Sequence, residues 1–209
     1  MIAIVDYGVG NLFSLKSSFA AIGENAVVTR DEKVLETADR ILLPGVGAFG
    51  DAAAKLRQTG MDQAVIRQAG TGKPLLGVCV GMQLLFDMDH EYGEHPGLGL
   101  IPGEVRDIGE VIDPSLKKPQ IGWNALHFRP VGNAPKSALF RYIKEGDYVY
   151  FVHSYAASEA TCAPYISATT EYSAELVAAV ERDNVYGTQF HPEKSGPVGL
   201  AILKAFCEL

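Results

Sequence analysis

The sequence has few cysteines, little positive charge and no long hydrophobic run. Its three cysteines are too few for a disulfide framework. A net charge of -7 makes nucleic acid an unexpected partner, because polyanions bind basic surfaces. Apolar stretches such as residues 74–80 are far too short to cross a bilayer, and the first residues lack the basic segment of a signal peptide. We therefore expect a cytoplasmic protein with reduced thiols.

The composition is that of a globular protein. Apolar residues make up 47% and charged residues 21%, so the chain can bury a core and is not expected to be disordered. The length of 209 residues suits one core of ordinary size. Because no internal repeat, low-complexity segment or linker interrupts the chain, we expect one domain over residues 1–209.

In the first half, short apolar runs alternate with helical stretches. The runs predict buried strands at residues 2–5, 26–29, 41–43 and 75–78. Helices are predicted from an Asn11 cap to residue 22, at 51–69 with a break near Gly60, and at 82–88. This alternation predicts an α/β fold with a central, mostly parallel sheet flanked by helices.

The second half has closely spaced strands and few helical stretches. Strands are predicted at residues 149–152, 165–170, 176–181 and 185–190. This spacing favours additional antiparallel strands attached to the same sheet. A closing helix is predicted at residues 197–209, with Pro197 near its first turn.

Cys79 is the predicted nucleophile. It lies in Gly-Val-Cys-Val-Gly, between a predicted strand and a predicted helix, which is the cysteine form of a nucleophile elbow. Helix N-terminal amides beside a thiol can lower its pKa and bind an oxyanion. A free cysteine is often only a small buried apolar residue, and we favour that interpretation for Cys162 and Cys207, which have no such context.

His191 is the predicted base. A thiol nucleophile needs a proton acceptor and a group that orients this acceptor. Among five histidines, His191 directly follows a predicted strand, and Glu193 lies two residues further on, where its carboxylate can accept from the imidazole. A surface His-Pro-Glu turn is the alternative interpretation, but the elbow at Cys79 favours a triad.

Oxyanion donors are predicted in the loop after the strand at 41–43. Its sequence is Pro44-Gly45-Val46-Gly47, and glycine lets backbone N–H groups approach a substrate closely. An ordinary glycine turn is the alternative, and the loop alone does not decide between the two.

Together these segments resemble the class I glutamine amidotransferases of the triad type. The resemblance covers nearly the whole chain and rests on residues 6–11 (DYGVGN), 44–51 (PGVGAFGD), 77–83 (GVCVGMQ), 121–124 (IGWN), 151–155 (FVHSY) and 189–195 (QFHPEKS). The elbow and the His-Pro-Glu segment mark the superfamily. Four of these segments together are similar to the glutaminase subunits that serve histidine biosynthesis, namely residues 6–11, 44–51, 121–124 and 189–195.

The resemblance implies a role for each site residue. Cys79 would attack the side-chain amide of glutamine to form a γ-glutamyl thioester, His191 would carry the proton to the leaving ammonia, and Glu193 would orient His191. Glutamine would be held by Val46, Gly47, Gln83, Ser154 and Tyr155. No cofactor and no metal are expected.

The resemblance also implies a protein partner. Residues Asn11, Trp123, Tyr150 and Lys194 would face a (β/α)8-barrel cyclase in a heterodimer, and ammonia would pass into the barrel. One departure is visible, because Gln120 precedes residues 121–124 where the family often has histidine. This puts a detail of the interface or a loop in doubt, and not the activity.

Three alternative functions remain at this point. A subunit of another synthase, such as anthranilate or pyridoxal phosphate synthase, fits residues 121–124 poorly. A catalytically silent binding module would have lost part of the triad, which is complete here. A cysteine peptidase of related fold shares the elbow, but Gln83 and the Lys194-Ser195 pair fit a glutaminase better.

Overall fold

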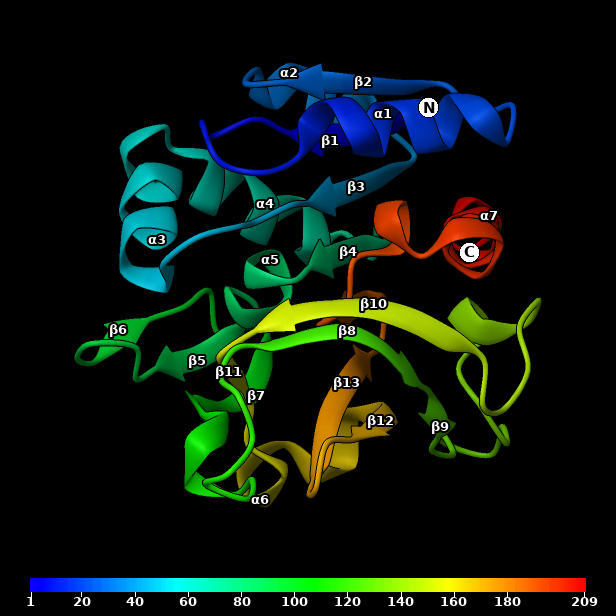
Figure 1. Cartoon of the computed structure of the whole chain (residues 1–209). Coiled ribbons are helices and arrows are strands. Elements are labelled where there is room, and N and C mark those ends of the chain that lie inside the picture. Colours follow the sequence, from blue (N-terminus) through cyan, green and yellow to red (C-terminus); the bar gives the residue numbers. More distant parts are fainter.

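The largest sheet carries the parallel core of the protein. The computed structural model describes residues 1–209 (Figure 1). This sheet has eight strands in the order β2-β1-β3-β4-β14-β13-β12-β9. The strands are β1 Ile2–Val5, β2 Ala26–Thr29, β3 Arg40–Leu43, β4 Leu75–Val78, β9 His127–Phe128, β12 Ile166–Glu171, β13 Glu175–Arg182 and β14 Val185–Thr188. Neighbours from β2 to β14 pair in parallel, and β13, β12 and β9 continue antiparallel. The predicted α/β fold with a mostly parallel sheet is confirmed.

Helices flank this sheet in two groups. The helices are α1 Leu12–Ala21, α2 Glu32–Thr37, α3 Phe49–Gln58, α4 Met61–Gly70, α5 Val80–Gln83, α6 Glu159–Cys162 and α7 Gly196–Cys207. Single 3-10 turns lie at η1 Ile108–Glu110, η2 Ala138–Phe140, η3 Ala163–Tyr165 and η4 Pro192–Lys194. Helix α1 packs against α7, while α2 and α3 pack against α4. None of the helices has the length and apolar character needed to span a bilayer.

Two smaller sheets lie next to the antiparallel part of the main sheet, where β8 contacts β12 and β11 contacts β13 (Figure 1). One pairs β8 (Gln120–Ala125) with β10 (Tyr148–His153), and the other has the order β11-β7-β5-β6, with β11 Tyr155–Ala157, β7 Ile101–Asp107, β5 Phe86–Asp89 and β6 His95–Pro96. The prediction that the strand at 149–152 joins the main sheet is therefore wrong. Its residues alternate between buried and accessible, as in a strand with one covered face.

The helix predicted at residues 82–88 is also wrong. Helix α5 ends at Gln83, and the chain enters strand β5. The three consecutive residues Leu84, Leu85 and Phe86 are all buried. The 84–87 backbone instead bonds to the following loop, where Leu98 N–H donates to the Leu84 carbonyl at 2.8 Å. Pairing with β7 and β6 therefore outweighs the local helical pattern.

Helix α1 begins at the predicted place, but its cap differs. Asn11 occupies the N-cap position, and its side chain makes no capping hydrogen bond. Its backbone carbonyl accepts from Leu15 N–H instead. Helix α2 was not predicted, although Asp31 caps it by accepting from Lys33 N–H, which is a signal the sequence carries.

The elbow packs directly against the backbone of the neighbouring loop. Cys79 has φ 56° and ψ -115°, an unusual conformation for a residue with a side chain. A Cβ on Gly81 would lie 2.0 Å from the Leu43 carbonyl oxygen, and one on Gly45 would lie 2.5 Å from Gly81 N. Only glycine therefore lets the loop after β3 approach the elbow at Cys79 so closely.

We predict that Gly81→Ala lowers the free energy of unfolding by about 3 kcal/mol, because the added methyl group must displace backbone. Chemical denaturation measures this difference. Gly70→Ala is the matched control: it lies at the end of α4 with open space around it, and should be neutral or slightly stabilising. Equal stability of the two variants would contradict the packing argument.

Candidate active site

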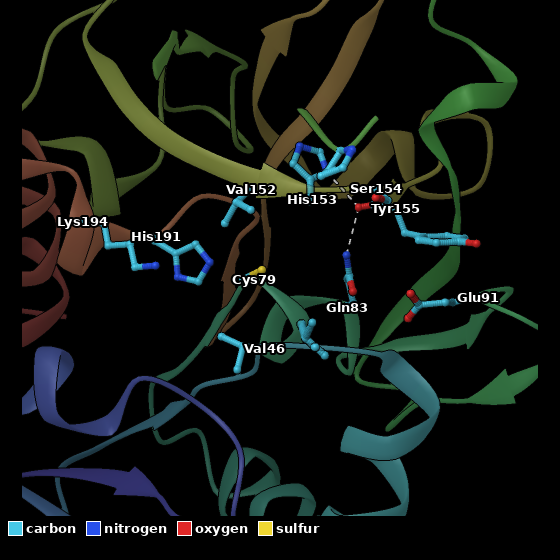
Figure 2. A pocket seen from close by; sticks show the side chains of 13 residues that line it. Val46, Cys79, Gln83, Glu91, Val152, His153, Ser154, Tyr155, His191 and Lys194 are labelled. Atoms are coloured by element: carbon cyan, nitrogen blue, oxygen red, sulfur yellow. Dashed lines mark hydrogen bonds between the residues drawn. The ribbon is translucent and has the colours of Figure 1, made fainter. Parts of the chain in front are cut away.

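The C-terminal ends of β4 and β14 meet at a pocket of about 390 Å³. Both Cys79 and His191 line it (Figure 2). The two strands are parallel neighbours in which Thr188 lies opposite Val78, and Cys79 N–H donates to the Thr188 carbonyl at 2.8 Å. This register brings the residues that follow each strand to the same edge of the sheet, where sites of α/β proteins gather.

His191 is held by Glu193 in the turn that follows β14. The distance from His191 Nδ1 to Glu193 Oε1 is 2.8 Å, and both side chains are almost fully buried. Because a carboxylate only accepts, Nδ1 is the donor of this hydrogen bond. Nε2 is the ring nitrogen that Glu193 does not contact. Figure 2 shows the ring on the Cys79 side of the pocket. The structure thus brings all three predicted triad residues together.

The surroundings of His191 favour its charged form. Burial by itself lowers the pKa of the imidazole, but hydrogen bonding and charge attraction to Cys79 and Glu193 outweigh burial and raise the pKa to about 9. At neutral pH the ring therefore keeps its proton. An imidazolium next to Cys79 stabilises a thiolate, which is the nucleophilic form of cysteine.

All five residues predicted to hold glutamine line the same pocket. They are Val46, Gly47, Gln83, Ser154 and Tyr155. Gly47 has φ 84°, so the loop after β3 uses the conformational freedom of glycine at the pocket wall. Gln83 projects from α5, and its Nε2 donates to the Tyr155 carbonyl at 3.0 Å. Their contacts with a substrate remain predictions.

Three of the four predicted partner residues form one cluster beside the pocket. Trp123 and Tyr150 lie opposite each other on β8 and β10, with ring centroids 6.1 Å apart. Lys194 Nζ lies 5.7 Å from the centroid of the Tyr150 ring, and Lys194 also lines the pocket. Trp123 is half exposed. Asn11 stands separately, at the start of α1.

Glu91 is a pocket residue that sequence reasoning missed. It follows β5 in an acidic, glycine-containing loop that resembles a solvated surface segment. In the structure its carboxylate lines the pocket, and Figure 2 shows it beyond Gln83 as seen from His191, on the same side as the Tyr155 ring. Glu91 N–H donates to Asp89 Oδ1 at 2.6 Å, and Glu91 Oε2 accepts from Phe49 N–H at 2.6 Å. These contacts fix a negative charge at one end of the pocket.

Gln120 lies inside the wall of the site and not on a surface loop. It is 1% exposed, and its side-chain amide lies 2.9 Å from His153 Nε2. His153 Nδ1 donates to the Tyr155 carbonyl at 2.9 Å. Burial lowers the pKa of His153 to about 4, so the ring is neutral and its Nε2 accepts. The amide NH₂ of Gln120 is therefore the group that faces His153.

Comparison with known proteins gives the family. The sequence profile described as glutamine amidotransferase class-I matches residues 3–208. The chain is 45% identical to imidazole glycerol phosphate synthase subunit HisH of Wolinella succinogenes over 210 residues, which cover all of both chains. It is 44% identical to HisH of Methanothermobacter thermautotrophicus, covering all of this chain and 98% of the relative. The chain belongs to the HisH family of class-I glutamine amidotransferases.

Solved structures share the fold of this HisH-family chain. A crystal structure described as a glutamine amidotransferase aligns with a TM-score of 0.73 and 18% identity, covering 100% of this chain and 98% of the other. PurLQS from Thermotoga maritima aligns with a TM-score of 0.73 and 17% identity, covering 99% and 97%. At these identities the likeness concerns the fold alone.

We predict that His191 titrates near pH 9 in the wild-type chain and at a lower pH in Cys79→Ala, since Glu193 alone then opposes the effect of burial. Because the folded pKa lies above the usual 6.5, this group's contribution to stability is complete below about pH 6.5 and is lost as the pH rises through about 9. NMR titration of the ring proton measures the midpoint. Cys207→Ala, at the end of α7, is the control and should leave the His191 midpoint unchanged. A wild-type midpoint near 6.5 would exclude a resting ion pair.

Proposed function

We propose that the chain is the glutaminase subunit of an imidazole glycerol phosphate synthase, and that Cys79, His191 and Glu193 catalyse its reaction. Glutamine and water are converted to glutamate and ammonia. The observation that carries this proposal is the shared pocket of Cys79 and a Glu193-bound His191, in a chain 45% identical over its whole length to a HisH subunit. A subunit of another synthase and a cysteine peptidase are disfavoured, because the chain belongs to the HisH family.

The geometry supports covalent catalysis. The Cys79 thiolate attacks the side-chain amide carbon of glutamine, and the oxyanion is stabilised by the N–H of Val80, the residue after the nucleophile, and by the loop at Val46 and Gly47. His191 gives its proton to the leaving nitrogen, so ammonia departs and a γ-glutamyl thioester remains on Sγ. His191 then takes a proton from water, whose oxygen attacks the thioester and releases glutamate and the thiolate.

Glutamine recognition involves charged and polar groups on the pocket wall. Glutamine carries an α-ammonium and an α-carboxylate besides its side-chain amide. Glu91 is the carboxylate at the pocket end away from His191, and it suits the α-ammonium through a charge-assisted hydrogen bond (Figure 2). Ser154, Tyr155 and Gln83 offer polar groups for the rest of the molecule.

The partner is the HisF cyclase subunit, a (β/α)8 barrel that forms a heterodimer with this chain. The half-exposed Trp123, Tyr150 and Lys194 support this, since clustered aromatic rings beside a cation are typical of interface anchors. Asn11 is proposed to contact the same partner. Ammonia enters the barrel, and the products are imidazole glycerol phosphate and an aminoimidazole carboxamide ribotide, in histidine biosynthesis.

We further propose that residues 1–209 act as one amidotransferase domain in the cytoplasm. Support for one domain comes from a core cluster of 52 buried residues that extends from Ile2 to Phe206 and draws on all three sheets. Support for the cytoplasm comes from three free cysteines, which suit a reducing compartment.

We predict that Cys79→Ala abolishes glutamine-dependent synthase activity in complex with HisF, while ammonium salts still support the barrel reaction. The reason is that only ammonia production needs the thiol. Glutamate release and imidazole glycerol phosphate formation are the two measurements. Cys207→Ala, at the end of α7, is the matched control and should retain both. Glutaminase activity in Cys79→Ala would refute the nucleophile, and failure of wild type to function with HisF would refute the partner.

We predict that Glu91→Gln raises the KM for glutamine, with a loss in kcat/KM of roughly ten- to a hundredfold, because a charged hydrogen-bond partner of the α-ammonium is removed. Steady-state kinetics of the complex separate KM from kcat. Glu94→Gln changes an exposed carboxylate of the same loop and should leave both parameters unchanged. An unchanged KM in Glu91→Gln would exclude this mode of recognition.

A further inference from the structure

Gln189 is a fully buried polar residue next to the nucleophile. It directly follows β14, two positions before His191, and none of its side chain is exposed. Its Nε2 lies 3.8 Å from Cys79 Sγ and donates a hydrogen bond to it. Sulfur is a large acceptor, so this distance is longer than in bonds to oxygen. The contact puts an amide N–H on the atom that reacts with glutamine.

The orientation of the Gln189 amide is fixed by a backbone carbonyl. The Tyr155 carbonyl can only accept, so the Gln83 group that lies 3.0 Å from it is the NH₂ (Figure 2). The same Gln83 NH₂ lies 3.1 Å from the Gln189 side chain, whose facing atom must accept and is therefore Oε1. The NH₂ of Gln189 is left to face the sulfur. These contacts, and not an arbitrary assignment of the two amide orientations, therefore place the NH₂ group of Gln189 at the Cys79 sulfur.

The network continues behind the pocket wall. His153 Nδ1 donates to the same Tyr155 carbonyl at 2.9 Å, and Gln120 lies against the other ring nitrogen. Gln83, Gln120, His153 and Gln189 are all buried. The Gln189 amide has a partner at both ends, Gln83 at its oxygen and Cys79 at its nitrogen, so its donor is held in place before substrate arrives.

We propose that Gln189 is a catalytic residue of the glutaminase reaction, and that its amide N–H stabilises the Cys79 thiolate. The proposal rests on the nucleophile role proposed above for Cys79. Negative charge is present on sulfur before attack and returns to sulfur when water cleaves the thioester. A fixed donor in a buried site favours both states. Gln83 acts through Gln189 and is a positioning residue in addition to its place in the substrate pocket.

The test is the pH profile of Cys79 alkylation by iodoacetamide in the full-length chain, with the labelled residue identified by mass spectrometry. Gln189→Met keeps the length of the side chain and removes the donor. We expect its apparent thiol pKa to rise by about one unit and its alkylation at pH 7 to slow roughly tenfold. In the complex with HisF, kcat should fall roughly tenfold with little change in KM.

Gln189→Glu is the second variant, in case the methionine variant does not fold. Its carboxylate repels the thiolate, so alkylation at pH 7 should be slower than in wild type. Gln68→Met, a buried glutamine on α4 that bonds to Lys73, is the matched control and should leave the profile unchanged.

Two failures are distinguishable. If wild-type Cys79 is not alkylated in preference to Cys162 and Cys207, the proposed nucleophile is wrong. If Cys79 is selectively alkylated, but folded Gln189→Met or Gln189→Glu has the wild-type pH profile, the role of Gln189 is overturned.

Discussion

The parallel pairing of β4 with β14 is the contact on which the site depends. Residues 79 and 191 are far apart in the chain, and no local structure could bring them together. The pairing of Val78 with Thr188 does so, because both strands then end at the same edge of the sheet. The elbow after β4 and the His-Pro-Glu turn after β14 start from this edge. A slip of one residue in this pairing would turn the side chains of one strand to its opposite face and separate the sulfur from the imidazole.

Around this contact, the protein concentrates strain and charge in a small buried volume. Cys79 has a positive φ, His191 Nδ1 donates to Glu193 Oε1 at 2.8 Å, and Gln189 faces the sulfur. Each feature is costly alone, since strain and buried polar groups oppose folding. The close packing at Gly45 and Gly81 and the 52-residue core stabilise the fold that carries them. The smaller sheets add the opposite wall, which supplies Ser154 and Tyr155.

The accuracy of the sequence predictions followed the strength of local signals. The four strands predicted in the first half were placed within a residue, because fully buried parallel strands are short apolar runs between turns. The predicted helix at 82–88 failed because the pairing of β5 with β7 is not encoded locally. The strand at 149–152 was found, but assigned to the wrong sheet. Glu91 was missed since a charged residue in a polar loop looks the same in sequence whether it faces solvent or a pocket.

The sequence by itself determined the type of fold and singled out Cys79, His191 and Glu193 as a candidate triad, because an elbow and a His-Pro-Glu turn each need specific residues at fixed spacing. Only the tertiary structure decided which polar side chains share the pocket. The charge state of His191, the neutral ring of His153 and the direction of the Gln189 amide all depend on burial and on partners distant in the chain. Electrostatic properties are set by distance in space, and spacing along the sequence does not fix that distance.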